Sequence, residues 1–261
     1  MRDPHVAKLR YRLVTAETVS FDQAPPVERE AEAFRMRLAD DIVTFEMVEH
    51  HASEESARTC VQPYLRAWEL DAALRFGHRE IGFEFRDADV IDRDPPPPGT
   101  AQVICPKPAV ATATVGEVTL HFTRREYPEP PEGFVVSADV ETMWHRYLGY
   151  LEGREPFISM AYFCLTVLEW SAGGRPEAAE QFGTDSEVLR TLGRLTSQVG
   201  DEETARKFNR QGERRPHTRA EKAWIEAAVK ALIRRAGEWA SNREAPRPQL
   251  TMNDLPMLTS F

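Results

Sequence analysis

The order of hydrophobic and polar residues changes character about halfway along the chain. Up to about residue 135, apolar residues mostly alternate with polar ones, which is typical of strands with one buried face. From residue 137 onward they recur every three or four positions, as in amphipathic helices. Prolines interrupt residues 127–133, and proline neither donates a ladder hydrogen bond nor continues a helix. We therefore expect a strand-rich domain over 1–135, a helical bundle over 137–242 and an extended apolar tail over 243–261.

The first half is expected to contain one helix among its strands. Two alternating runs, residues 34–38 and 43–47, flank a short polar turn, which predicts a hairpin with one buried face. Ser53 is a suitable N-cap for a helix that ends near Phe76, and Pro63 is expected to kink or split that helix. Further alternating strands follow, so we predict an α+β fold. Its N-terminal domain is a mainly antiparallel sheet with one helix, and its C-terminal domain is a helical bundle.

The second half carries helix start signals at regular intervals. Thr184 with Glu187, and Thr218 with Glu221, have the spacing of capping boxes. The helix predicted from residue 157 to residue 170 is apolar on nearly every side, which is typical of the central helix of a bundle. We expect four or five helices in all.

The tail after Arg243 is too apolar for a solvated segment. One interpretation is an extended strap that packs on its own chain, and the other is a strap that binds another subunit. We prefer the first, because ordered termini are usually held by local contacts.

The composition is that of an ordinary globular protein and excludes several other classes. The chain has 261 residues, of which 41% are hydrophobic and 29% charged, so it is too apolar to be disordered. Its three cysteines cannot form a disulfide framework. No apolar run approaches the roughly 20 residues that a membrane helix needs, and the first residues do not resemble an export signal. We expect a cytoplasmic protein without a membrane partner.

Charge is distributed unevenly along the chain. Residues 1–135 account for nearly all of the net charge of −9, whereas residues 206–235 hold ten basic and three acidic side chains. Because arginine binds phosphate with two parallel hydrogen bonds, this segment is a candidate RNA-binding site. The predicted RNA- or phosphate-binding residues are Arg206, Lys207, Arg214, Arg215 and Arg219. The alternative is a solvated helix face that pairs with the acidic first domain.

Arg210 and His217 lie in this basic segment with six residues between them. In this pair and in its helical pattern, the second half resembles HEPN domains, helical bundles in which an Arg-x(4–6)-His pair cleaves RNA. A strand-rich domain before such a bundle is also similar to the arrangement of abortive-infection proteins. The resemblance covers at most residues 137–242. It implies that Arg210 and His217 are catalytic and that the protein is a homodimer with both pairs in one cleft.

In that chemistry the histidine accepts the ribose 2′-hydroxyl proton and the arginine stabilises the developing negative charge on phosphorus. Neither step needs a metal, and no cofactor is predicted.

No metal site is predicted either. His50 and His51 are adjacent at the end of a predicted strand, where neighbouring side chains point to opposite faces, so we interpret both as surface residues. No cysteine or third histidine lies at the spacing of a metal-binding motif, and nucleotide-binding and hydrolase motifs are absent. Glu169, in the very apolar helix, is expected to form an ion pair with a residue such as arginine.

The sequence therefore leaves two functions open. The preferred one is a non-catalytic binding or assembly module, because no catalytic group of residues here is specific. The alternative is a HEPN-like, metal-independent ribonuclease that acts as a toxin or phage-defence effector. The two hypotheses differ on whether Arg210 and His217 converge on an open cleft.

Overall fold

The architecture is α+β, with an antiparallel sheet followed by helices, which confirms the predicted fold class. The computed structural model describes residues 3–16, 19–21, 23–77, 80–94, 122–200 and 215–258. Contacts divide the chain into two compact units. The sheet unit comprises Met1–Leu65 and Arg79–Glu129, and the helical unit comprises Arg66–His78 and Pro130–Phe261.

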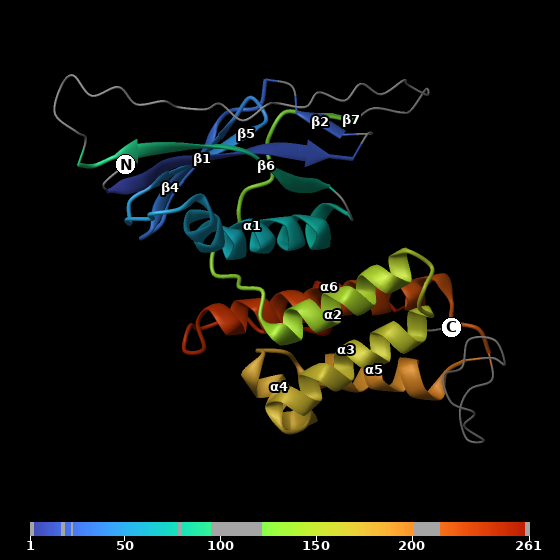
Figure 1. Ribbon diagram of the computed structural model, residues 1–261. Helices are drawn as coiled ribbons and strands as arrows, with labels where there is room; N and C mark the ends of the chain where they lie inside the picture. Colours follow the sequence, from blue (N-terminus) through green and yellow to red (C-terminus); the bar gives the residue numbers. More distant parts are fainter. Residues whose placement is uncertain are drawn as a thin grey trace. The chain divides into compact units, whose positions relative to one another are not determined.

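A five-stranded antiparallel sheet is the main element of the sheet unit (Figure 1). Its strands lie in the order β3-β4-β5-β1-β6. Their bounds are β1 (Pro4–Thr15), β3 (Val27–Glu30), β4 (Phe34–Ala39), β5 (Ile42–Met47) and β6 (Ile81–Asp92). A separate parallel pair joins β2 (Val19–Phe21) to β7 (Phe122–Arg124).

The β4–β5 hairpin has the buried face that its sequence predicts. Its buried apolar residues are Phe34, Met36, Leu38, Val43, Phe45 and Met47. Asp40 and Asp41 connect the strands with positive φ angles of 51° and 57°, which match the right-handed twist of a two-residue hairpin. Because both the alternation and the turn are local features, this prediction is confirmed.

Helix α1 (Glu54–Phe76) begins and ends where the sequence indicates. The Ser53 hydroxyl accepts a hydrogen bond of 3.2 Å from the Ser56 backbone N–H, and Gly77 follows the helix with a positive φ of 129°. Of the two expected effects of Pro63, a kink or a split, the split does not occur, because the helix continues through this residue. A proline removes only one main-chain hydrogen bond, which a helix of 23 residues tolerates.

The first part of α1 packs on the buried face of the sheet. Ala57 and Val61 are fully buried, and the ring of Tyr64 lies 5.2 Å from that of Phe34 and 6.0 Å from that of Phe45. These contacts fix the first turns of α1 on β4 and β5.

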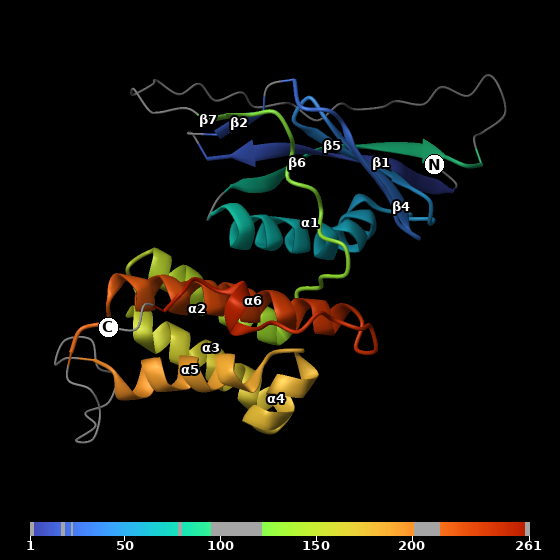
Figure 2. The ribbon, with the colours of Figure 1, turned by 180° about the vertical axis from the view of Figure 1, so that it is seen from behind.

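Five helices of the second half are described (Figures 1 and 2). Their bounds are α2 (Ala138–Leu151), α3 (Phe157–Ala172), α4 (Arg175–Gln181), α5 (Ser186–Gln198) and α6 (Arg219–Ser241). Helix α4 was not predicted, because the glycines before it read as a simple helix terminator. Helix α3 packs against all four of the others, as expected of a central helix.

Helix α3 is central in the helical unit, but its C-terminal end is not covered on every side. Trp170 is 83% exposed there. Glu169 beside it forms the expected ion pair, since Arg175 Nε lies 2.5 Å from its carboxylate. Helix α3 therefore has one face in the core and one open to solvent.

One of the two predicted capping boxes is present. At α6 the Thr218 hydroxyl accepts from the Glu221 N–H at 3.1 Å, and the Glu221 carboxylate accepts from the Thr218 N–H at 2.8 Å. At α5 the N-cap is Asp185, which accepts from the Glu187 N–H at 2.9 Å. Thr184 instead forms a backbone bridge with the C-terminal tail, so a contact distant in sequence shifts the cap by one residue.

The described part of the tail packs on its own helical unit. Leu250 and Leu255 are buried in the core, and Met252–Asp254 form a short 3-10 helix between them. The Leu250 N–H donates to the Gly183 carbonyl, and the Leu250 carbonyl accepts from the Asp185 N–H, both at 2.8 Å. Figure 2 shows the C-terminal segment lying over α6. Of the two alternatives for the tail, the structure thus shows packing on the same chain.

Candidate functional site

The predicted catalytic histidine is a buried side chain. His217 lies immediately before Thr218, the N-cap of α6, and is 6% exposed. Its Nε2 lies 2.9 Å from the backbone carbonyl oxygen of Leu195 in α5. Because a carbonyl oxygen can only accept, Nε2 carries the proton and donates it. The imidazole thus links α5 to α6 inside the helical unit.

Arg215, one of the predicted phosphate-binding residues, is held by a carboxylate. Its two terminal nitrogens lie 2.8 and 2.7 Å from the two carboxylate oxygens of Glu221. This paired hydrogen bond, with a smaller contribution from the Thr218 backbone N–H, lowers the pKa of Glu221 to about 2. The Glu221 carboxylate therefore occupies the two terminal nitrogens of Arg215 that a bidentate phosphate contact would use.

The other predicted residues of the basic segment are described only in part. Arg219 is exposed in the first turn of α6. Arg210, Arg206, Lys207 and Arg214 lie outside the described residues. Convergence of Arg210 with His217, and phosphate binding by the other three, therefore stay predictions.

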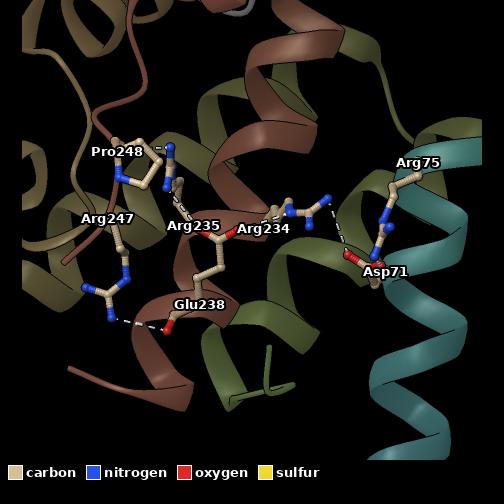
Figure 3. Close-up of polar contacts among 7 residues, drawn as sticks. All are labelled: Asp71, Arg75, Arg234, Arg235, Glu238, Arg247 and Pro248. Carbon is tan, nitrogen blue, oxygen red and sulfur yellow. Dashed lines mark hydrogen bonds and ion pairs between the residues drawn. The ribbon is translucent and has the colours of Figure 1, made fainter. Parts of the chain in front are cut away.

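Further along α6, basic side chains form contacts within the helical unit (Figure 3). Arg234 and Arg235 lie 3.1 and 3.0 Å from the two carboxylate oxygens of Glu238. Arg235 also donates to the carbonyl of Pro248 at 2.6 Å, and Arg247 donates to the backbone carbonyl of Glu238 at 3.2 Å. Arg235 and Arg247 thus hold the tail on α6, and all three guanidinium groups are engaged by acceptors of the same chain.

A buried carboxylate, Asp71 of α1, extends this network (Figure 3). Asp71 is fully buried, Arg75 donates to one of its oxygens, and Arg234 Nη1 lies 3.6 Å from the other. A buried carboxylate is costly unless it is paired, and two guanidinium groups provide that pairing here. We interpret Asp71 as a structural ion pair that joins α1 to α6.

The solvent face of the sheet carries a charged hollow of about 700 Å³. Its charged lining residues are Lys8, Arg10, Glu28, Arg29, Glu30, Arg35, Arg37 and Glu46. Cross-strand pairs join opposite charges, such as Lys8 with Glu46 at 2.7 Å and Arg10 with Asp89 at 2.5 Å. Exposed pairs of this kind contribute about 0–1 kcal/mol each to stability. Because basic and acidic side chains alternate, the hollow is not uniformly positive, as a nucleic-acid-binding surface would be.

A second buried histidine lies in the sheet unit, where the sequence predicted a surface residue. His51 is 8% exposed. Its carbonyl accepts from the Val6 N–H at 2.9 Å, and its own N–H donates to His5 Nδ1 at 3.4 Å. The prediction was wrong for His51 because β1, a strand distant in sequence, draws residue 51 inward before α1 begins.

The ring of His51 has one engaged nitrogen and one without a partner among the residues that the structure describes. Nδ1 lies 3.0 Å from the Ser56 hydroxyl. Nε2 is buried, and no group in the described parts of the chain forms a hydrogen bond with it. Glu49 and Cys60 lie beside the His51 ring, since one carboxylate oxygen, one ring nitrogen and the thiol sulfur are within 4.8 Å of one another.

Burial raises the pKa of the Cys60 thiol, and the nearby Glu49 carboxylate raises it further. Sequence reasoning missed this group because Cys60 lies within the next helix. The available signal was a Glu-x-His segment directly before the N-cap of a helix with an early cysteine.

No described helix of this chain has the length and apolar character needed to cross a membrane. No known family matches the sequence, and neither a curated protein nor a solved structure matches the chain.

Proposed function

We propose that this chain is a non-catalytic assembly module that forms a homodimer through the exposed face of α3. The observation that carries this proposal is Trp170, which is 83% exposed on a helix whose other face lies in the core. Tryptophan is enriched among the residues that dominate binding energy at protein interfaces. In a two-fold dimer the same surface of both subunits forms the interface. The exposed face of α3 would therefore pack against the α3 face of a second copy.

The surroundings of His217 favour assembly over RNA cleavage. A general base must reach the proton that it removes, whereas His217 is 6% exposed and donates Nε2–H to Leu195. Four of the six basic side chains that the structure describes in this segment pair with carboxylates of their own unit. These residues are Arg215, Lys230, Arg234 and Arg235.

The test is the molar mass of the purified chain, measured by light scattering over a range of concentrations. We expect a dimer, and we expect Trp170→Ser to be monomeric at the same concentration. Met257→Ser is the matched control, because Met257 is 85% exposed but lies in the tail. A monomeric wild-type chain, or a dimer that Trp170→Ser leaves intact, would contradict the proposal.

The HEPN-like ribonuclease is the second hypothesis, and the spacing of Arg210 and His217 supports it. The experiment is RNA cleavage by the purified chain in the presence of a chelator, compared with Arg210→Ala. Arg210→Ala is more informative than His217→Ala, because loss of a buried side chain also destabilises the fold. Equal cleavage by both proteins would assign the activity to a contaminant.

A further inference from the structure

Three side chains of different donor chemistry meet next to the start of α1. Glu49 and His51 follow β5, and Cys60 lies in the second turn of α1. All three belong to the sheet unit, and one donor atom of each lies within 4.8 Å of the other two. A carboxylate oxygen, an imidazole nitrogen and a thiol sulfur thus converge on one point.

An independent observation at His51 indicates that this point accepts a ligand. The residue is 8% exposed, yet its Nε2 lacks a hydrogen-bond partner among the residues that the structure describes. Buried polar groups nearly always have partners, and an exception requires an explanation. A bound cation would complete the coordination of this nitrogen.

The other ring nitrogen sets the tautomer that such a ligand needs. The Ser56 hydroxyl lies 3.0 Å from Nδ1 and can accept its proton, which leaves the Nε2 lone pair free. A hydrogen bond of this kind, from the non-ligating nitrogen to an acceptor, orients metal-binding histidines in general. The backbone of His51 is also fixed, through hydrogen bonds to Val6 and His5.

We infer that Glu49, His51 Nε2 and Cys60 bind a divalent transition-metal ion of the zinc class. Mixed oxygen, nitrogen and sulfur ligands suit zinc, and the carboxylate and thiolate together balance its two positive charges. On binding, the Cys60 sulfur forms a bond to the metal and releases its proton to the solvent. Three protein ligands leave the fourth tetrahedral position for water or a small ligand.

The distances fit this ion after a small movement. Ligand atoms of a tetrahedral zinc site lie about 3.5 Å apart, since zinc–nitrogen and zinc–sulfur bonds are about 2.0–2.3 Å long. The donor atoms, at up to 4.8 Å, must therefore approach one another by about 1 Å. Glu49 is exposed, so its side chain is free to make this adjustment.

The neighbouring histidine provides a contrast within the same segment. His50 is exposed, its Nε2 lies 3.5 Å from an Asp3 carboxylate oxygen, and its Nδ1 lies 3.3 Å from Arg93. Both of its nitrogens have partners, so His50 is not a ligand. His50→Ala is therefore a matched control for His51→Ala.

The test uses the full chain, stripped of metal with a chelator and then titrated with Co²⁺ as a spectroscopic substitute for Zn²⁺. We expect one Co²⁺ per chain, with a near-ultraviolet thiolate-to-metal charge-transfer band and the strong visible bands of tetrahedral Co²⁺. Zn²⁺ should displace it. Cys60→Ser should abolish the charge-transfer band, whereas Cys105→Ser, which changes a cysteine outside the described residues, should retain it.

Affinity measurements separate a metal site from a fold effect. Ser56→Ala should weaken binding by about 10- to 100-fold, the usual effect of losing a residue that orients a ligand. Glu49→Gln and His51→Ala should weaken it more, and His50→Ala should leave it unchanged. Glu49 is exposed, so Glu49→Gln folds normally, as circular dichroism will show. The assignment is overturned by sub-stoichiometric Co²⁺ binding, by a band that survives Cys60→Ser, or by a Glu49→Gln affinity equal to that of the wild type.

Discussion

Two buried histidines precede the two 23-residue helices α1 and α6. His217, before α6, donates from Nε2 to the carbonyl of Leu195, so its polar atom has a partner within the fold. His51, before α1, has a partner for Nδ1 and none for Nε2 in the described parts of the chain. The comparison shows that burial of a histidine does not by itself indicate a site. What sets His51 apart from a structural link such as His217 is this nitrogen together with the nearby donor side chains of Glu49 and Cys60.

The two regions also differ in how their carboxylates are held. Glu221 beside His217 is fixed by Arg215 and by the Thr218 N–H, whereas Glu49 beside His51 is an exposed side chain. Before α6, the carboxylate of Glu221 is thus neutralised by Arg215. The segment before α1 keeps an anionic group that a cation can recruit.

The largest expected effect concerns Glu221, whose pKa is lowered from 4.5 to about 2, chiefly by Arg215. Because the folded-state pKa is depressed, its stabilising contribution is complete above about pH 5 and is lost as the pH falls towards 2. The shift corresponds to roughly 3 kcal/mol at neutral pH. We expect Glu221→Gln to lose up to this amount in urea unfolding at pH 7, with the difference from wild type shrinking towards pH 2.

Glu187→Gln is the control for this prediction. Glu187 also pairs with an arginine, Arg190, but both side chains are more than half exposed. Loss of the Glu187–Arg190 pair should lower the free energy of unfolding by no more than about 1 kcal/mol. The difference in free energy of unfolding between the wild type and Glu221→Gln should shrink from pH 7 to pH 2. If it stays constant, the Arg215–Glu221 pair does not stabilise the fold through charge.

Zinc should stabilise the region before α1 and leave the region before α6 unaffected. A ligand that binds only the folded state at 100 times its dissociation constant adds about 2.7 kcal/mol to the free energy of unfolding. We expect this gain for the wild type and for His217→Phe, and none for His51→Ala, in thermal unfolding with and without Zn²⁺. An equal gain in His51→Ala would place the metal elsewhere.

Replacing each histidine by phenylalanine, without metal, should give opposite results. His217→Phe keeps a ring but leaves the buried Leu195 carbonyl without its donor, which costs about 1–3 kcal/mol. His51→Phe removes a nitrogen that has no partner in the described structure, and the exposed Ser56 hydroxyl can bond to water instead. The free energy of unfolding of His51→Phe should therefore fall by less than about 0.5 kcal/mol, or it should rise. Equal losses in urea unfolding would remove the distinction between the two sites.

The smallest expected effects are at the two helix caps. Thr218→Ala breaks a reciprocal capping box, and Ser53→Ala removes one hydrogen bond, so we expect losses of about 1–2 and about 0.5–1 kcal/mol. Chemical denaturation measures both. A larger loss for Ser53→Ala would indicate that the cap also positions His51.

Features determined by neighbouring residues were predictable. The β4–β5 hairpin, both ends of α1 and the capping box of α6 follow from alternation, turn residues and caps within a few positions. Asp185 replaces Thr184 as a cap because the tail pairs with Thr184, and no local pattern reveals that contact. The exposure of Trp170 was missed because periodicity shows which residues are apolar and not how many sides of a helix are covered.

For this protein, the sequence by itself determined the fold class, most element boundaries and the uneven distribution of charge. These depend on short-range geometry and on residue counts. Only the tertiary structure decided that His217 Nε2 has a partner, that His51 Nε2 has none among the described residues, and that the His51 ring lies near Glu49 and Cys60. Whether a buried polar atom has a partner depends on groups from distant segments, such as Leu195 for His217. The physical reason is that hydrogen bonding and burial are properties of the packed chain, whereas periodicity is a property of the sequence alone.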